Sequence, residues 1–73
     1  GIRINAICPG FIETPLLRES IPEDQRAHLA SQHPMNRLGT PEDVAKAAMW
    51  LASDASSFVT GMLFSVDGGW TAI

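Results

Sequence analysis

An isoleucine-rich run at residues 2–7 is cut short by the pair Pro9-Gly10. β-branched residues favour strands, whereas proline lacks a backbone donor and glycine adopts backbone angles closed to other residues. We therefore predict a strand that ends here and a loop that leaves its carboxyl end. In an open α/β sheet such a loop lies where ligands bind. We expect Ile12 and Thr14 to offer backbone groups and a hydroxyl to a small polar ligand there, the alternative being an ordinary loop.

Composition narrows the classes of protein to which the chain can belong. Its 73 residues allow one small domain at most, and 45% hydrophobic with 18% charged residues is typical of a globular chain. The net charge is -3 and the five lysines and arginines are scattered, which argues against a nucleic-acid partner. No apolar run is long enough to span a bilayer, and no secretory signal is evident, so we expect neither a membrane partner nor secretion.

Two single residues indicate the cellular compartment of the chain and its relation to a longer sequence. Cys8 is the single cysteine, so no internal disulfide can form. We predict a buried strand cysteine in a cytoplasmic protein. The chain opens on Gly1, a residue type that commonly closes a helix just before the next element. We therefore expect the sequence to have been cut from something longer.

The first strand has two interpretations. Arg3 and Asn5 alone interrupt the apolar run at residues 2–7, which favours a strand covered on both faces, as in parallel sheets. Strict alternation would instead place Ile2 and Ile4 on one face and Arg3 and Asn5 on the other, as in a half-covered strand. The first interpretation is preferred.

Helical signals follow the loop. Pro15 opens one or two helical turns at residues 14–19. Ser20 and Glu23 then have the spacing of a capping box, which predicts a helix that runs to about Gln32. Few apolar positions anchor this helix, so the segment could move as a lid beside the loop. A plain surface helix is the alternative.

A stronger helix start lies at Thr40, which is followed by proline and two acids. The helix predicted over residues 41–52 is apolar around much of its circumference, so we expect it to pack against the sheet and against a second neighbour, which could be another subunit. Residues 62–66 predict a second strand, and we interpret the following Asp67-Gly68-Gly69 as a structural turn rather than an anion-binding nest.

These elements define the predicted fold class. The chain is an α/β, Rossmann-type fragment in which two parallel strands are joined by a right-handed helical crossover, in the order β-α-α-β. Two strands alone are not stable in water. We therefore expect the sheet to be completed by the remainder of its own fold or by other copies of the chain, most simply as a homo-oligomer.

Four motifs in register identify a family by resemblance. They cover essentially the whole chain and are Asn5-x-x-x-Pro9-Gly10-x-Ile12-x-Thr14, Arg37-x-Gly39-x-Pro41-Glu42-Asp43-Val44-Ala45, Thr60-Gly61 and Val66-Asp67-Gly68-Gly69. Together they resemble the carboxyl-terminal third of a short-chain dehydrogenase/reductase. The resemblance implies a Rossmann-type sheet and NAD- or NADP-dependent hydride transfer on alcohols and ketones.

The resemblance also implies roles for single residues. Pro9 and Gly10 would shape the turn beside the nicotinamide, the Ile12 backbone would bind the carboxamide, and the Thr14 hydroxyl would bind the carboxamide or the pyrophosphate. Residues 1–14 would then be strand and nicotinamide loop, residues 15–34 a mobile substrate lid, and residues 35–73 the packing helix and last strand of an oligomer interface.

The chain also lacks two features of the family pattern, and their absence bears on its activity. The glycine-rich phosphate loop is absent, and the chain contains no tyrosine to act as the family's catalytic acid. Lys46 follows Glu42 at the spacing that separates the family's tyrosine and lysine, but both are interpreted as surface residues of a helix. We therefore predict no catalytic residue in this chain and expect it to be inactive by itself.

Other candidates for chemistry are weak. His28 and His33 are five residues apart, which does not place them on one helix face, so no metal site is predicted. Either histidine could touch substrate in a complete enzyme. The leading prediction is thus the carboxyl-terminal part of an NAD(P)-dependent short-chain oxidoreductase. The alternative is a stand-alone, non-enzymatic module that self-associates or binds a protein partner.

Overall fold

The computed structural model describes residues 1–72 and contains two parallel strands with three α-helices and a short 3-10 helix, Asp54–Ser56, between them. Strand β1 (Ala6–Pro9) pairs with β2 (Leu63–Val66), from Ala6 opposite Leu63 to Pro9 opposite Val66. The helices are α1 (Pro15–Ser20), α2 (Glu23–Ser31) and α3 (Pro41–Ala52). This confirms the predicted α/β, Rossmann-type arrangement of two parallel strands with a helical crossover. The order is β-α-α-α-β and not β-α-α-β, because residues 15–31 form two separate helices. Residue 73, which the predicted last segment included, lies outside the described residues.

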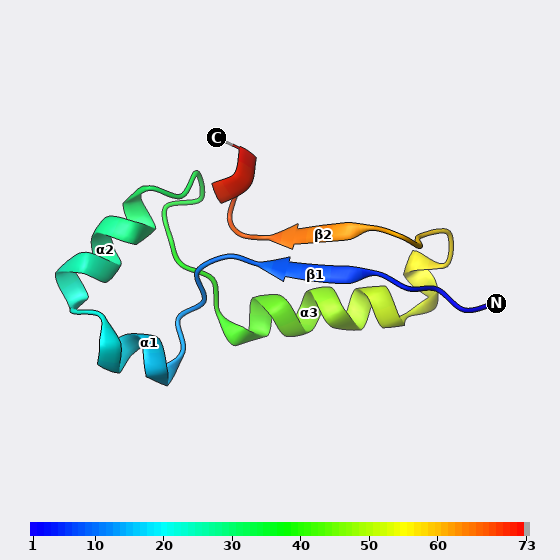
Figure 1. Cartoon of the computed structure of the whole chain (residues 1–73), viewed down its shortest axis with the longest axis horizontal. Helices are drawn as coiled ribbons and strands as arrows, with labels where there is room; N and C mark the ends of the chain where they lie inside the picture. The colour runs from blue at the N-terminus through cyan, green and yellow to red at the C-terminus, as the bar shows by residue number, and fades with distance from the viewer. Residues whose placement is uncertain (73) are drawn as a thin grey trace.

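The helices divide into two groups (Figure 1). Helix α3 runs alongside the strands, whereas α1 and α2 lie beyond their carboxyl ends, next to the loops that leave β1 and β2. The segment 15–34 is therefore placed at the edge of the sheet where ligands bind in open α/β proteins. We refer to residues 15–34 as the lid segment.

Strand β1 begins later and ends later than predicted. Ladder pairing starts at Ala6, and before it the Arg3 and Asn5 side chains bind the Val59 carbonyl of the segment that leads into β2. The Asn5 amide donates to the Val59 carbonyl at 3.2 Å and its oxygen accepts from the Met62 amide at 2.9 Å. Pro9 can remain in the strand because its neighbour Gly10 makes the ladder bond, from its amide to the Val66 carbonyl, so no donor is required of the proline.

The Arg3 guanidinium connects the start of the chain to the end of α3. It donates to the carbonyls of Leu51 and Ser53 at 3.0 and 3.2 Å, to the Ser56 hydroxyl at 3.1 Å and to the Val59 carbonyl at 3.3 Å. Carbonyls at a helix C-terminus lack partners within the helix and carry partial negative charge, so a cation stabilises them. This residue thereby fixes α3 relative to the strand that leads to the loop of interest.

Coverage of the sheet is one-sided within this chain. Within this chain Ile2, Ile4 and Cys8 are exposed whereas Arg3 and Ile7 are half-buried, which is the alternating pattern, and coverage of the second face stays a prediction. Cys8, which was predicted to be buried, lies on the exposed face of this chain.

Helix α3 likewise has a free side. Trp50 packs edge-on against Phe64 of β2, with ring centroids 5.8 Å apart, whereas Met49 is 72% exposed. Packing against the sheet is confirmed, and a second neighbour for this helix stays a prediction. Among residues 1–72, Leu38 is the one buried apolar residue, with 8% of its surface exposed.

The helix starts differ from one another. Thr40 caps α3 as predicted, accepting from the Asp43 amide while the Asp43 carboxylate accepts from the Thr40 amide. The capping box predicted at Ser20 is wrong: Ser20 is the last residue of α1, and Pro22 occupies the cap position of α2 without a side-chain bond. No helix among residues 1–72 is both long and apolar enough to cross a membrane.

Candidate cofactor loop at the carboxyl edge of the sheet

The loop that follows β1 is held on one side by the connector between α2 and α3. The Gly39 amide donates to the Phe11 carbonyl at 2.9 Å, and the Glu13 amide donates to the Gly39 carbonyl at 2.8 Å. These two bonds form a parallel bridge between Ile12 and Gly39. Residues 11–13 are thus held in an extended conformation, with the backbone bonds on the side of the connector.

The bridge determines where the Ile12 backbone points. In a parallel bridge the bonds are made by the residues on either side, so the N–H and C=O of the central residue face away from the partner. Within residues 1–72 neither the Ile12 amide nor its carbonyl has a hydrogen-bond partner. The loop therefore presents one donor and one acceptor side by side, the pattern that pairs with an amide group.

Gly10 lets the loop approach the turn after β2. A Cβ at this position would lie 2.7 Å from Asp67 Cβ and 3.0 Å from Asp67 Cα, closer than real contacts allow. Any side chain here would push the two loops apart. A hollow of about 360 Å³ opens beside this contact, lined by the end of β1, by Ser65 and by the turn that includes Asp67 and Trp70.

Thr14 has a structural role that the sequence interpretation did not foresee. Its hydroxyl oxygen accepts from the Leu17 amide at 3.2 Å and so caps α1. A hydroxyl that accepts one bond still has its proton to donate. Capping is therefore compatible with donation to a ligand oxygen at the start of the lid segment.

The turn after β2 is stabilised by the carboxylate of Asp67, which belongs to the turn itself. The Asp67 carboxylate accepts from the Thr71 hydroxyl at 2.7 Å and from the amides of Gly69 and Thr71 at 3.0 and 3.3 Å. The bond from the Thr71 side chain, followed by the backbone bonds, holds the pKa of this carboxyl below its ordinary value. Gly68 and Gly69 have φ of 61° and 92°, which suits glycine. The interpretation as a structural turn is confirmed.

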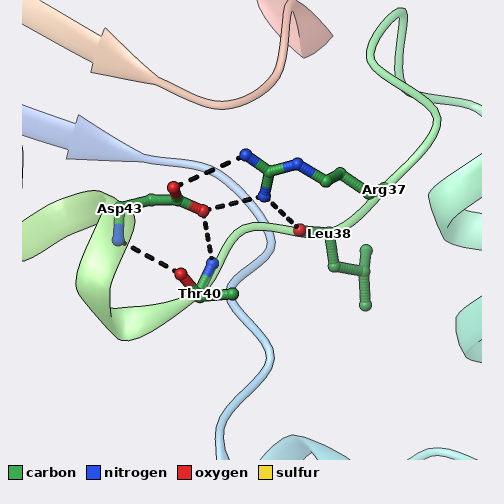
Figure 2. A network of polar contacts seen from close by, with 4 residues as sticks. All are labelled: Arg37, Leu38, Thr40 and Asp43. Carbon is green, nitrogen blue, oxygen red and sulfur yellow. Dashed lines mark hydrogen bonds and ion pairs between the residues drawn. The ribbon is translucent and has the colours of Figure 1, made fainter.

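A polar cluster orients the connector (Figure 2). The Arg37 guanidinium donates to the Asp43 carboxylate at 2.8 Å and to the Leu38 carbonyl at 3.1 Å, and Asp43 also accepts from the Thr40 amide. The bond from Arg37, then those from Thr40, hold the pKa of the Asp43 carboxyl far below its usual range, and the pKa of Arg37 is raised in turn. This cluster fixes the connector whose Gly39 pairs with the loop.

The two histidines lie in different surroundings. His28 is exposed on α2, with its Nε2 3.3 Å from the Gln32 amide nitrogen. His33 is only 2% exposed and does not face an open surface. Among residues 1–72, no three His, Cys, Asp or Glu side chains converge as metal ligands would. Lys46 and Glu42 are exposed, as predicted.

Comparison with known proteins agrees with this arrangement of a crossover unit and a carboxyl-edge loop. Residues 1–71 match the family model described as enoyl-(acyl carrier protein) reductase. The chain is 52% identical to cis-4-hydroxycyclohexanecarboxylate dehydrogenase of Sinomonas cyclohexanicum, over all of its own length and 29% of the relative. It is also 52% identical to the 3-oxoacyl-[acyl-carrier-protein] reductase FabG of Thermotoga maritima, over 94% of this chain and 28% of that protein. The chain belongs to the short-chain dehydrogenase/reductase family.

Solved structures give the same fold. The ligand-free aldohexose dehydrogenase of Thermoplasma acidophilum superposes with a TM-score of 0.88 at 41% identity, over 97% of this chain and 32% of that one. ElxO with NADP bound gives 0.87 at 41% identity, over all of this chain and 30% of that one. The chain thus spans about 30% of the length of the relatives it matches.

Proposed function

We propose that this chain is the carboxyl-terminal part of an NAD(P)-dependent oxidoreductase that transfers hydride between the nicotinamide and an alcohol or ketone. Family membership and the presence of NADP in a structural relative support this activity. By itself the chain is inactive, because it contains no tyrosine to exchange the substrate proton. The cytoplasm is its proposed location.

The observation that carries the proposal is the free donor–acceptor pair of Ile12. A nicotinamide carboxamide has an oxygen that accepts and an amino group that donates, so it can pair with the Ile12 amide and carbonyl. Pro9 and Gly10 shape the approach to this pair, and the Thr14 hydroxyl donates to the carboxamide or to the pyrophosphate. The bound nicotinamide supplies or accepts the hydride, while these residues orient it.

The remaining segments have supporting roles in this proposal. The lid segment, residues 15–34, closes over substrate at the carboxyl edge of the sheet. The segment 35–73 contributes α3 and β2 to the contact between subunits of a homo-oligomer, which would cover the exposed Met49. Ile2, Ile4 and Leu63, which are 90%, 74% and 75% exposed, favour a second candidate: a non-enzymatic module that uses this apolar sheet face to bind another protein or itself.

Replacing Ile12 tests the proposal in the full-length enzyme that contains this chain. Ile12→Pro removes the Ile12 amide N–H. The two bridge bonds, from the Gly39 amide to the Phe11 carbonyl and from the Glu13 amide to the Gly39 carbonyl, keep both donor and acceptor. We expect Kd for NADH or NADPH, whichever the parent binds, to rise about tenfold, the size expected when a buried hydrogen bond is lost and its partner left unpaired. Ile12→Val is the matched control, since it keeps the amide.

The affinity for ADP-ribose distinguishes an effect on the nicotinamide site alone from a general loss of cofactor binding. The 2′-phosphate form of ADP-ribose is used if the parent prefers NADPH. It lacks the nicotinamide, so its affinity should be equal in parent and variant. A parent enzyme that binds neither NADH nor NADPH would refute the proposal and favour the binding module. Equal dinucleotide affinity in parent and Ile12→Pro would remove the role of Ile12.

A further inference from the structure

Three aromatic rings from distant parts of the chain meet beside the loop. Phe11 lies edge-on to His33 and to Trp70, with ring centroids 5.9 and 5.2 Å apart, and His33 lies 4.8 Å from Trp70. Phe11 belongs to the loop after β1, His33 closes the lid segment, and Trp70 follows the turn after β2. The cluster therefore joins the three segments that gather at the carboxyl edge of the sheet.

His33 is fixed within this cluster by one hydrogen bond. Its Nδ1 lies 2.7 Å from the Leu29 carbonyl of α2. A carbonyl only accepts, so Nδ1 carries the proton and the ring is held in one orientation. The other nitrogen, Nε2, is buried and has no hydrogen-bond partner within residues 1–72. An unpartnered buried nitrogen costs free energy, so this histidine is not explained as a simple filler of apolar space.

The lid segment has little else to hold it. Neither α1 nor α2 buries a residue, and His33 is the one buried position of 15–34. The ion pair from Arg18 to Glu13 is exposed on both sides and contributes little. Arg26 donates to the carbonyls of Arg18 and Ile21, which connects α2 to α1 but not to the sheet. The position of the lid thus depends on its buried end.

We infer that His33 is a positioning residue that couples the lid segment to the nicotinamide loop. One side of its ring binds the lid through Leu29, and the other contacts Phe11, the residue directly before Ile12. Displacing the end of the lid therefore displaces the Phe11 ring and, with it, the amide–carbonyl pair of Ile12. The inference rests on the proposed function and assigns a role to a residue that does not itself touch cofactor or substrate.

Two substitutions cut the two connections of His33 separately. His33→Asn keeps a donor where Nδ1 lies and removes the ring, whereas His33→Phe keeps the ring and removes the donor. In the full-length enzyme, His33→Asn should raise Kd for NADH or NADPH about fivefold, in the range of one aromatic pair. His33→Phe should leave that Kd within about twofold of the parent and raise substrate KM about fivefold, in the range of one hydrogen bond.

Phe11→Leu measures the same ring contact from the loop side and serves if His33→Asn does not fold. It should raise the dinucleotide Kd about fivefold, and the loss in the double variant should be smaller than the product of the two single losses, because each substitution removes the shared contact between Phe11 and His33. The affinity for ADP-ribose should not change in any of them. Multiplicative losses, equal losses for ADP-ribose, or an unchanged Kd in His33→Asn and Phe11→Leu would overturn the coupling. A parent that binds no dinucleotide would instead refute the proposed function.

Discussion

Gly10 is the residue on which the approach of the two loops depends. Its missing side chain allows contact with the backbone and Cβ of Asp67, neither of which can rotate away. Gly10→Ala should therefore destabilise the full-length enzyme by about 1–3 kcal/mol, the usual cost of overpacking. It should also weaken dinucleotide binding, because Ile12 lies two residues further along. Urea denaturation and cofactor titration measure the two effects.

Gly61→Ala is the matched control for Gly10→Ala. A Cβ at Gly61 meets nothing within 4 Å, but φ is 71° there, so alanine is strained without displacing a neighbour. Stability should fall by about 1 kcal/mol, whereas cofactor affinity should equal that of the parent. If Gly10→Ala likewise leaves cofactor affinity unchanged, the two loops are not held at the distance described here.

Asn36 adopts a backbone conformation that few residues tolerate. It is the one non-glycine residue within 1–72 with positive φ, at 57°, and it closes the turn in which its amide donates to the His33 carbonyl at 2.8 Å. Asn36→Ala should cost about 1 kcal/mol, because alanine has a Cβ but lacks the short polar side chain that lets asparagine tolerate this region, whereas Asn36→Gly should match or exceed parental stability. Urea midpoints of the two variants test this, and equal losses in both would contradict a backbone cause.

At the scale of elements, the start of α3 depends on a charged cluster that titrates in acid. The folded state lowers the pKa of Asp43 below the value of about 3.9 in an unfolded chain, through Arg37 and Thr40. The resulting stability is complete above about pH 4, declines as the unfolded chain takes up protons below it, and is gone once pH falls below the folded-state pKa. The cluster should therefore make stability fall in acid.

Asp43→Asn isolates this charge, since its amide oxygen can still accept from Thr40. The variant should melt at a lower temperature than the parent at pH 7, and the gap should shrink as pH falls below about 4. Thermal melts of both proteins between pH 3 and 7 measure it. A gap that stays constant across this range would show that the carboxylate charge does not act as described.

Local signals account for the elements that the sequence predicted correctly. Thr40, Pro41 and two acids specify the start of α3 without help from distant residues, and the structure has the helix there. Ser20 carried a similar signal, yet α1 continues through it, since the Ile21 amide bonds back to the Leu17 carbonyl and Pro22 becomes the cap. Where two short helices adjoin, the competition between their ends cannot be settled from spacing alone.

The candidate site was predictable only in part, for the same reason. Its location followed from the end of the strand at Pro9-Gly10. The direction of the Ile12 backbone depends on a bridge to Gly39, and the burial of His33 depends on rings far away in the chain. Such long-range pairings leave no periodic signal in the sequence. The one local signal in the sequence is the glycine in each segment that comes close to another, Gly10 in the loop after β1 and Gly39 in the connector.

The whole molecule is less compact than a chain of its size should be. Its radius of gyration is 14.2 Å, against about 11 Å for a compact domain of 73 residues. It exposes 5300 Å², whereas a compact monomer of this mass exposes about 4,400 Å². Several large apolar side chains, among them Ile2, Ile4 and Leu63, contribute to this exposed surface. Both measures indicate a surface that another part of a fold, or another chain, should cover.

We therefore expect the isolated 73-residue chain not to be a folded monomer. A two-stranded sheet with one apolar face open to water lacks the burial needed for independent stability, so the chain should self-associate or lose cooperative structure. Sedimentation velocity combined with thermal unfolding measures both. Charged residues in place of Ile4 and Leu63 should reduce association through the sheet face, whereas Met49→Glu on α3 should reduce it only if the helix side is the contact. A monodisperse monomer with a cooperative melt would contradict this expectation, because it would mean that the α3 side of the sheet alone supplies a sufficient core.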